Sequence, residues 1–174
     1  MSLTKNMPLD IPIKNSHNDY WCLRPFVDAY TQHDCNCFEA DLIYTCDKFY
    51  LAHSIWQKKC GDFQELYLQP IYEECMQYPD VHLWIDIEFK SSFDIDALAN
   101  IFKIYHSEQL PALPNMHYLV NVCEPNNWKT LYRKGRSKSA HDFYDKYNKE
   151  FNLVWKDDFR EALPDGYFKQ DDYF

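Results

Sequence analysis

The sequence predicts an α/β fold in which helices connect the strands of a parallel sheet or barrel. Apolar segments with the two-residue period of strands alternate along the chain with segments that have the 3.6-residue period of helices. The chain has 174 residues, a length typical of one domain, and 46% of them are hydrophobic, which is enough for a packed core. Strands that alternate with helices usually pair in parallel through right-handed crossovers.

The first half of the chain begins with residues 1–10, which we expect to form a loose leader before a domain at 11–174. The following segments predict a strand (11–17), a helix with Pro25 in its first turn (23–30), a strand (38–44) and its hairpin partner (48–53). Asp62 is positioned to cap the next helix. Pro70 should kink or divide that helix, because proline has no N–H to donate.

The second half continues this alternation as far as residue 155. We expect a strand over 81–89, a helix over 93–108, a strand over 117–123, a helix over 128–149 and a short strand over 152–155. From Asp157 onward the sequence is acidic and has no clear period, so no element is predicted there. Apart from the hairpin partner at 48–53, the sheet is therefore expected to contain about five strands.

The composition excludes several classes of function. Three isolated glycines cannot form the glycine-rich loops that hold nucleotide phosphates. A net charge of −9 disfavours nucleic-acid binding, which depends on lysine and arginine. No apolar run approaches the roughly 18 residues of a membrane span, and no secretory signal is visible. A cytoplasmic location with reduced thiols is the expectation.

Ionisable and polar side chains gather where the predicted strands end, which is where sites form in parallel α/β folds. They are His17, Asn18 and Asp19 after the first strand, Glu39 and Asp41 on the second, His53 after the hairpin, and Asp86 and Glu88 on the third. Each has a simple structural alternative, such as a solvated strand face or a hydrogen-bonded histidine. Asp86 follows an apolar run, so a carboxylate there needs a metal ion, an ion pair or several donors.

Several short motifs, in this order and at this spacing, resemble those of the PI-PLC-like phosphodiesterases. That superfamily includes glycerophosphodiester phosphodiesterases and sphingomyelinase D enzymes. The motifs are His17-Asn18-Asp19-Tyr20, Phe38-Glu39-Ala40-Asp41, Leu51-Ala52-His53 and Ile85-Asp86-Ile87. The sequence is most similar to the altered-inheritance-of-mitochondria branch, since it also has Arg24-Pro25 and Leu66-Tyr67-Leu68-Gln69-Pro70. The resemblance covers residues 11–125.

This resemblance implies a TIM-barrel fold and metal-dependent cleavage of a glycerophosphodiester or a phospholipid-like substrate. It assigns Glu39, Asp41 and Asp86 to one Mg²⁺ or Ca²⁺ ion, and carboxylate oxygens suit these hard cations. It also assigns His17 and His53 to acid–base catalysis on either side of phosphorus. Two imidazoles can activate a nucleophile and protonate a leaving oxygen. Further candidates for contacts with the substrate or with these groups are Asn18, Asp19, Glu88 and Lys90.

Three departures from the family pattern keep a second hypothesis open, and the first is the lack of the turn glycines expected before the strand of Glu39 and within residues 47–49. Glu88 stands where the family usually has a lysine that contacts the substrate phosphate, although Lys90 lies on the same predicted strand face. The chain is also shorter than the about 250 residues of a complete barrel. The alternative is a catalytically silent relative that serves as a metal-binding or protein-interaction domain. A partial or truncated barrel without its C-terminal half would have an open edge, which favours a homo-oligomer.

Overall fold

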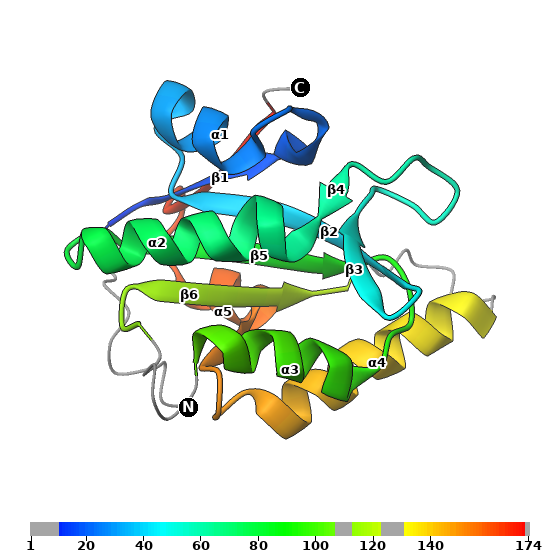
Figure 1. Cartoon of the computed structure of the whole chain (residues 1–174). Coiled ribbons are helices and arrows are strands. Elements are labelled where there is room, and N and C mark those ends of the chain that lie inside the picture. The colour runs from blue at the N-terminus through cyan, green and yellow to red at the C-terminus, as the bar shows by residue number, and fades with distance from the viewer. Residues whose placement is uncertain (1–10, 107–112, 123–130, 173–174) are drawn as a thin grey trace.

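The computed structural model describes residues 11–106, 113–122 and 131–172, and the strands in these ranges form one sheet of eight strands (Figure 1). The strands are β1 (Ile13–His17), β2 (Cys37–Thr45), β3 (Lys48–Leu51), β4 (Gly61–Asp62), β5 (Leu83–Phe89), β6 (Met116–Asn121), β7 (Leu153–Trp155) and β8 (Phe168–Asp172). The helices are α1 (Pro25–His33), α2 (Gln69–Gln77), α3 (Ile95–Tyr105), α4 (Leu131–Tyr147) and α5 (Lys156–Ala162), with short helical turns η1 (Asp19–Trp21) and η2 (Gln64–Leu68). The predicted leader lies outside the described residues.

Six strands run parallel in the order β8–β1–β2–β5–β6–β7. The predicted hairpin is confirmed, since β3 turns back antiparallel to the second half of β2, and the short β4 pairs with β3. The prediction of an α/β fold is therefore confirmed, and the mostly parallel sheet is consistent with a partial barrel.

The helical segment that follows β4 runs on through Pro70 without the predicted division, since the π-helical turn η2 passes directly into α2. The turn η2 has the wider π-helical spacing, in which the N–H of Gln69 donates to the carbonyl of Gln64. Regular α-helix begins only at Gln69. A proline cannot donate to the carbonyl four residues before it, so an α-helix that ran through Pro70 would lose a hydrogen bond there.

The two faces of the sheet carry different side chains because successive strand residues point to opposite sides. One face packs against α2, α3 and α4 through large apolar side chains such as Phe38, Ile85 and Tyr118. The opposite face holds a smaller apolar cluster that includes Cys37 and Trp84, together with acidic residues. Figure 1 shows α2 and α3 in front of the sheet and α5 behind it. We call the α5 side the inner face.

The C-terminal segment differs from the prediction, which placed no element after Asp157 and about five strands in the sheet. Helix α5 covers the inner face near the beginning of strands β1, β2 and β5. There, Phe159 packs into the cluster of Ile13, Cys37 and Trp84. Strand β8 pairs in parallel with β1 over its whole length. The segment was missed because α5 buries few apolar side chains and β8 is mostly polar. Pairing with β1, rather than an apolar face, holds β8 in the sheet.

No helix in the described ranges is both long enough and apolar enough to cross a membrane.

Replacement of Phe159 by alanine tests whether α5 is part of the folded core. Phe159 is 2% exposed, and truncation of a buried phenylalanine typically costs about 3–5 kcal/mol of unfolding free energy. Urea denaturation followed by tryptophan fluorescence measures this loss. Glu161→Ala, at an exposed position on the same helix, is the control and should change the free energy by less than about 0.5 kcal/mol. Equal, small effects of both substitutions would show that α5 does not cover the sheet.

Candidate active site

Four carboxylates lie on neighbouring positions of two adjacent strands. In the parallel pairing of β2 with β5, Glu39 stands opposite Asp86, and Asp41 stands opposite Glu88. The two-residue period of both strands directs all four side chains to the inner face. All four residues are buried, with exposed fractions of 8% or less. Burial of so many acidic groups is costly unless cations or hydrogen-bond donors accompany them.

Three of these carboxylates converge. Ligand oxygens of Glu39, Asp41 and Glu88 all lie within 4.8 Å of one another. Lys90, which the sequence places on the same face, lies beside them: its Nζ is 3.2 Å from Asp41 Oδ2 and forms an ion pair with Glu88. The structure therefore brings together two of the three predicted metal ligands, Glu39 and Asp41, with Glu88 as the third member.

Asp86 has other partners. Its Oδ2 atom accepts a hydrogen bond from Asn15 Nδ2 at 3.2 Å and forms an ion pair with the ammonium of Lys156, the first residue of α5. Both partners are buried. Lys156 was not among the residues that the sequence singled out. The contact joins residues on β5 and α5 that lie far apart in the chain, so no local motif reports it.

The electrostatics of the cluster follow from its burial. Burial, with the neighbouring charge of Asp41, raises the pKa of Glu39 to about 9. Burial also raises the pKa of Asp41, although the positive charge of Lys90 opposes this shift. Burial lowers the pKa of Lys90, but the charges of Asp41 and Glu88 outweigh it, so the pKa rises overall. Near neutral pH the cluster therefore keeps a proton on Glu39, and a bound divalent cation would displace this proton.

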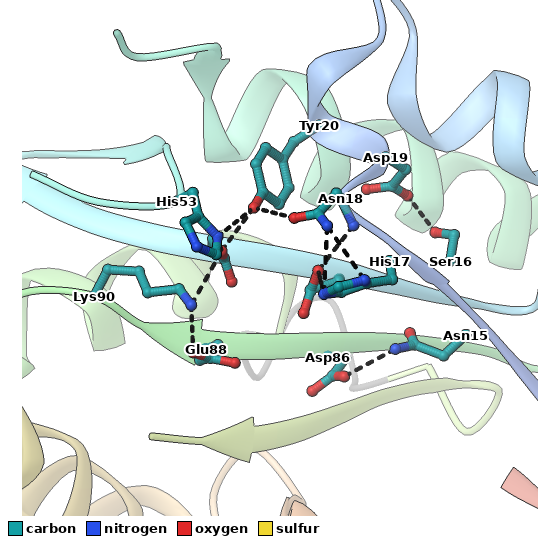
Figure 2. A network of polar contacts seen from close by, with 12 residues as sticks. Asn15, Ser16, His17, Asn18, Asp19, Tyr20, His53, Asp86, Glu88 and Lys90 are labelled. Atoms are coloured by element: carbon teal, nitrogen blue, oxygen red, sulfur yellow. Dashed lines mark hydrogen bonds and ion pairs between the residues drawn. The ribbon is translucent and has the colours of Figure 1, made fainter. Parts of the chain in front are cut away.

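The two predicted catalytic histidines lie on either side of this cluster (Figure 2). His17 ends β1, and its Nε2 atom is 3.6 Å from Glu39 Oε2. His53 follows β3, and its Nδ1 atom is 3.2 Å from Asp41 Oδ2. Their side chains are 29% and 51% exposed, so both rings can meet a molecule from solvent. Each histidine thus contacts one of the two β2 carboxylates.

Tyr20 connects His53 with the carboxylates, although the sequence singled it out only as the last residue of a motif. Its hydroxyl lies 2.7 Å from Asp41 Oδ2 and 2.8 Å from Asn18 Oδ1, so its proton can be donated to either oxygen. The same hydroxyl is 3.3 Å from His53 Nδ1. Burial and the charge of Asp41 raise the pKa of Tyr20, which keeps the hydroxyl protonated. Tyr20 therefore helps to orient His53.

Asn18 and Asp19 shape the turn after β1. Asn18 adopts a left-handed conformation (φ 58°), which asparagine tolerates better than most residues, and its backbone N–H donates to Glu39 Oε2 at 2.9 Å. Asp19 lies away from the cluster in the interior, where its carboxylate accepts hydrogen bonds from Ser16 and Tyr67. Asp19 therefore anchors the turn that presents Asn18 and Tyr20.

Comparison with known families agrees with these motifs over the first part of the chain. Residues 4–80 match the AIM6-like phosphodiesterase domain. The matched range contains His17, Glu39, Asp41 and His53, whereas the β5 carboxylates lie beyond it. No curated protein matches the chain. The match confirms the resemblance to this branch of the PI-PLC-like phosphodiesterases and identifies the matched segment as phosphodiesterase-like.

Replacement of Asp19 by asparagine tests the buried anchor through the pH dependence of stability. Burial, opposed by the hydrogen bonds from Ser16 and Tyr67, raises the pKa of Asp19 from 3.8 to about 7. Between these values the folded chain keeps a proton that the unfolded chain has lost. The contribution of Asp19 to the free energy of unfolding is therefore fully present below about pH 4. It is lost as the pH rises towards 7.

The expected result is that Asp19→Asn gains stability relative to the wild type as the pH rises from 4.5 to 7, by up to about 1.4 kcal/mol per pH unit. Urea denaturation across this range measures the difference. Asp80→Asn, at an exposed position, serves as the control and should show no such trend. A constant difference between Asp19→Asn and wild type would contradict the buried anchor.

Proposed function

We propose that the chain hydrolyses phosphodiesters by acid–base catalysis between His17 and His53, with one divalent cation held by Glu39, Asp41 and Glu88. The observation that carries the proposal is the group of three converging carboxylates with a partly exposed histidine on each side. The match of residues 4–80 to a phosphodiesterase domain supports the same class of reaction. The proposed substrate is a glycerophosphodiester or a phospholipid-like molecule.

The residues of the cluster fit a hard divalent cation. All donors are carboxylate oxygens, the type that Mg²⁺ and Ca²⁺ prefer. Asp41 Oδ1 is buried and has no hydrogen-bond partner among the described residues, so it has a free acceptor position. When bound, the cation would neutralise negative charge on the phosphoryl oxygens. The family resemblance points to Asp86 as the β5 ligand. Because Glu88, and not Asp86, belongs to the group of converging oxygens with Glu39 and Asp41, we assign this role to Glu88.

The two histidines would move the protons of the reaction. One imidazole takes a proton from the attacking water or hydroxyl group, and the other gives a proton to the leaving oxygen as the P–O bond breaks. His53 Nδ1 faces Asp41 and Tyr20, so we assign its Nε2 atom to proton transfer. Asp41 and Tyr20 would hold this ring in place. Lys90 would hold Asp41 and Glu88 together, rather than contact the phosphate.

Hydrolysis of bis(p-nitrophenyl) phosphate in the presence of Mg²⁺ or Ca²⁺ tests the proposed catalysis. His17→Ala and His53→Ala should each lower the rate by about 10²- to 10⁴-fold, because each removes one proton-transfer group. His33→Ala, at the far end of α1, is the matched control and should keep the wild-type rate. Lysophospholipids are then offered as substrates to test the proposed class of substrate. Wild-type rates in both site variants would exclude the assigned roles.

The second candidate function is a catalytically silent domain. The observation that favours it is that two lysines already lie within the carboxylate cluster: Lys90 contacts Asp41 and Glu88, and Lys156 contacts Asp86. These ammonium groups could serve as the permanent counterions of a purely structural network. The two candidates differ in whether the protein binds a divalent cation.

Isothermal titration of the protein with Mg²⁺ and with Ca²⁺ separates the two candidates. We expect binding of one cation per chain, strongly weakened in Asp41→Asn and Glu88→Gln because each removes a charged ligand. Asp96→Asn, which changes a carboxylate on the exposed surface of α3, is the control and should bind like the wild type. Absence of binding to the wild-type chain would favour the silent domain.

A further inference from the structure

Two neighbouring loops beside the candidate site expose large apolar side chains to water. Leu23 is 91% exposed and Trp56 is 89% exposed, while Trp21 is 50% exposed. Of the nine large apolar side chains that are exposed among the described residues, four lie within residues 21–23 and 55–56. Scattered exposed apolar residues are ordinary in soluble proteins, but a concentration of them indicates an interaction surface.

The two loops are side by side. Residues 20–23 and 58–60 line one shallow hollow of about 370 Å³. Figure 1 shows the longer loop, between β3 and β4, projecting outward from the molecule. We call residues 20–24 and 54–60 the loop surface. It adjoins the candidate site, because Tyr20 contacts Asp41 and His53 directly precedes the second loop.

The loop surface is basic, although the whole chain has a net charge of −9. Its residues include Arg24, Lys58 and Lys59 and contain no aspartate or glutamate. Arg24 forms an exposed ion pair with Asp28 of α1, whereas Lys59 lies over the ring of Tyr50, with 4.3 Å between Nζ and the ring centroid. The combination of exposed tryptophan and leucine with lysines is the pattern of proteins that bind at the surface of anionic membranes.

We propose that the loop surface docks the protein on an anionic lipid bilayer. Trp21, Leu23 and Trp56 would enter the boundary between headgroups and acyl chains, where tryptophan is favoured. Lys58 and Lys59 would attract the anionic headgroups. A fluid bilayer suits apolar side chains that project from separate loops, whereas a rigid protein partner needs a continuous complementary face.

Docking in this orientation would bring the candidate site to the membrane surface, because the loop that begins after His53 carries Trp56. The role of docking in catalysis rests on the proposed function. If the substrate is phospholipid-like, the docked protein would reach it directly at the bilayer. The docking itself does not require hydrolysis. The two proposals can therefore fail separately.

Sedimentation with lipid vesicles tests the docking. The vesicles are made of phosphatidylcholine alone or with about 30% phosphatidylserine, an anionic lipid. We expect the wild type to bind the anionic vesicles and Leu23→Ser/Trp56→Ser to bind them at least about tenfold more weakly. Lys58→Gln/Lys59→Gln should lose the preference for anionic vesicles. Met76→Ser/Ile104→Ser, which removes two exposed apolar side chains of 53% and 54% exposure elsewhere on the molecule, is the control and should bind like the wild type.

Several results would overturn the docking. One is the absence of binding to anionic vesicles, and another is equal binding by all variants. A third is a wild-type dimer that dissociates in the variant Leu23→Ser/Trp56→Ser, because this would show that a second copy of the chain covers the loop surface. His17→Ala/His53→Ala separates the proposals, since it should bind vesicles like the wild type. Wild-type binding without hydrolysis of bis(p-nitrophenyl) phosphate would support docking and contradict the proposed function. Hydrolysis without vesicle binding would support the proposed function and contradict the docking.

Discussion

The burial of four carboxylates on two adjacent strands is the constraint on which the rest of the site depends. Glu39, Asp41, Asp86 and Glu88 lie opposite one another in pairs across β2 and β5, in the interior of the inner face. An arrangement of this kind is unstable without nearby positive charge. The chain supplies Lys90 just after β5 and Lys156 at the start of α5. The C-terminal segment therefore contributes to the site as well as to the fold.

The sequence predicts only those parts of this arrangement that follow from the alternation of residues within a single strand. The alternation in β2 and β5 shows that Glu39 and Asp41 share a face, and that Lys90 lies on the face of Asp86 and Glu88. It does not show the register between the two strands, which decides that Asp41 stands opposite Glu88. The choice between the two β5 carboxylates depends on which of them converges with Glu39 and Asp41, a tertiary arrangement with no local signal.

The C-terminal elements could not be predicted for a related reason. The sequence of β8 has no alternating apolar side chains, because its stability comes from backbone pairing with β1. Helix α5 is only seven residues long and contributes Phe159 to the inner cluster. The role of Tyr20 is similar, since its importance comes from the left-handed turn at Asn18. Elements that are held by such tertiary contacts can be recognised from the three-dimensional structure but not from the sequence.

The central claim is that Glu39, Asp41 and Glu88 hold one divalent cation between the two histidines. Crystals grown with Mn²⁺, whose anomalous scattering marks its position, test this claim most directly. The account predicts one anomalous peak within about 2.0–2.6 Å of oxygens from all three carboxylates, with Lys156 still paired to Asp86. A peak on Asp86 in place of Glu88, or no peak in the cluster, would contradict it.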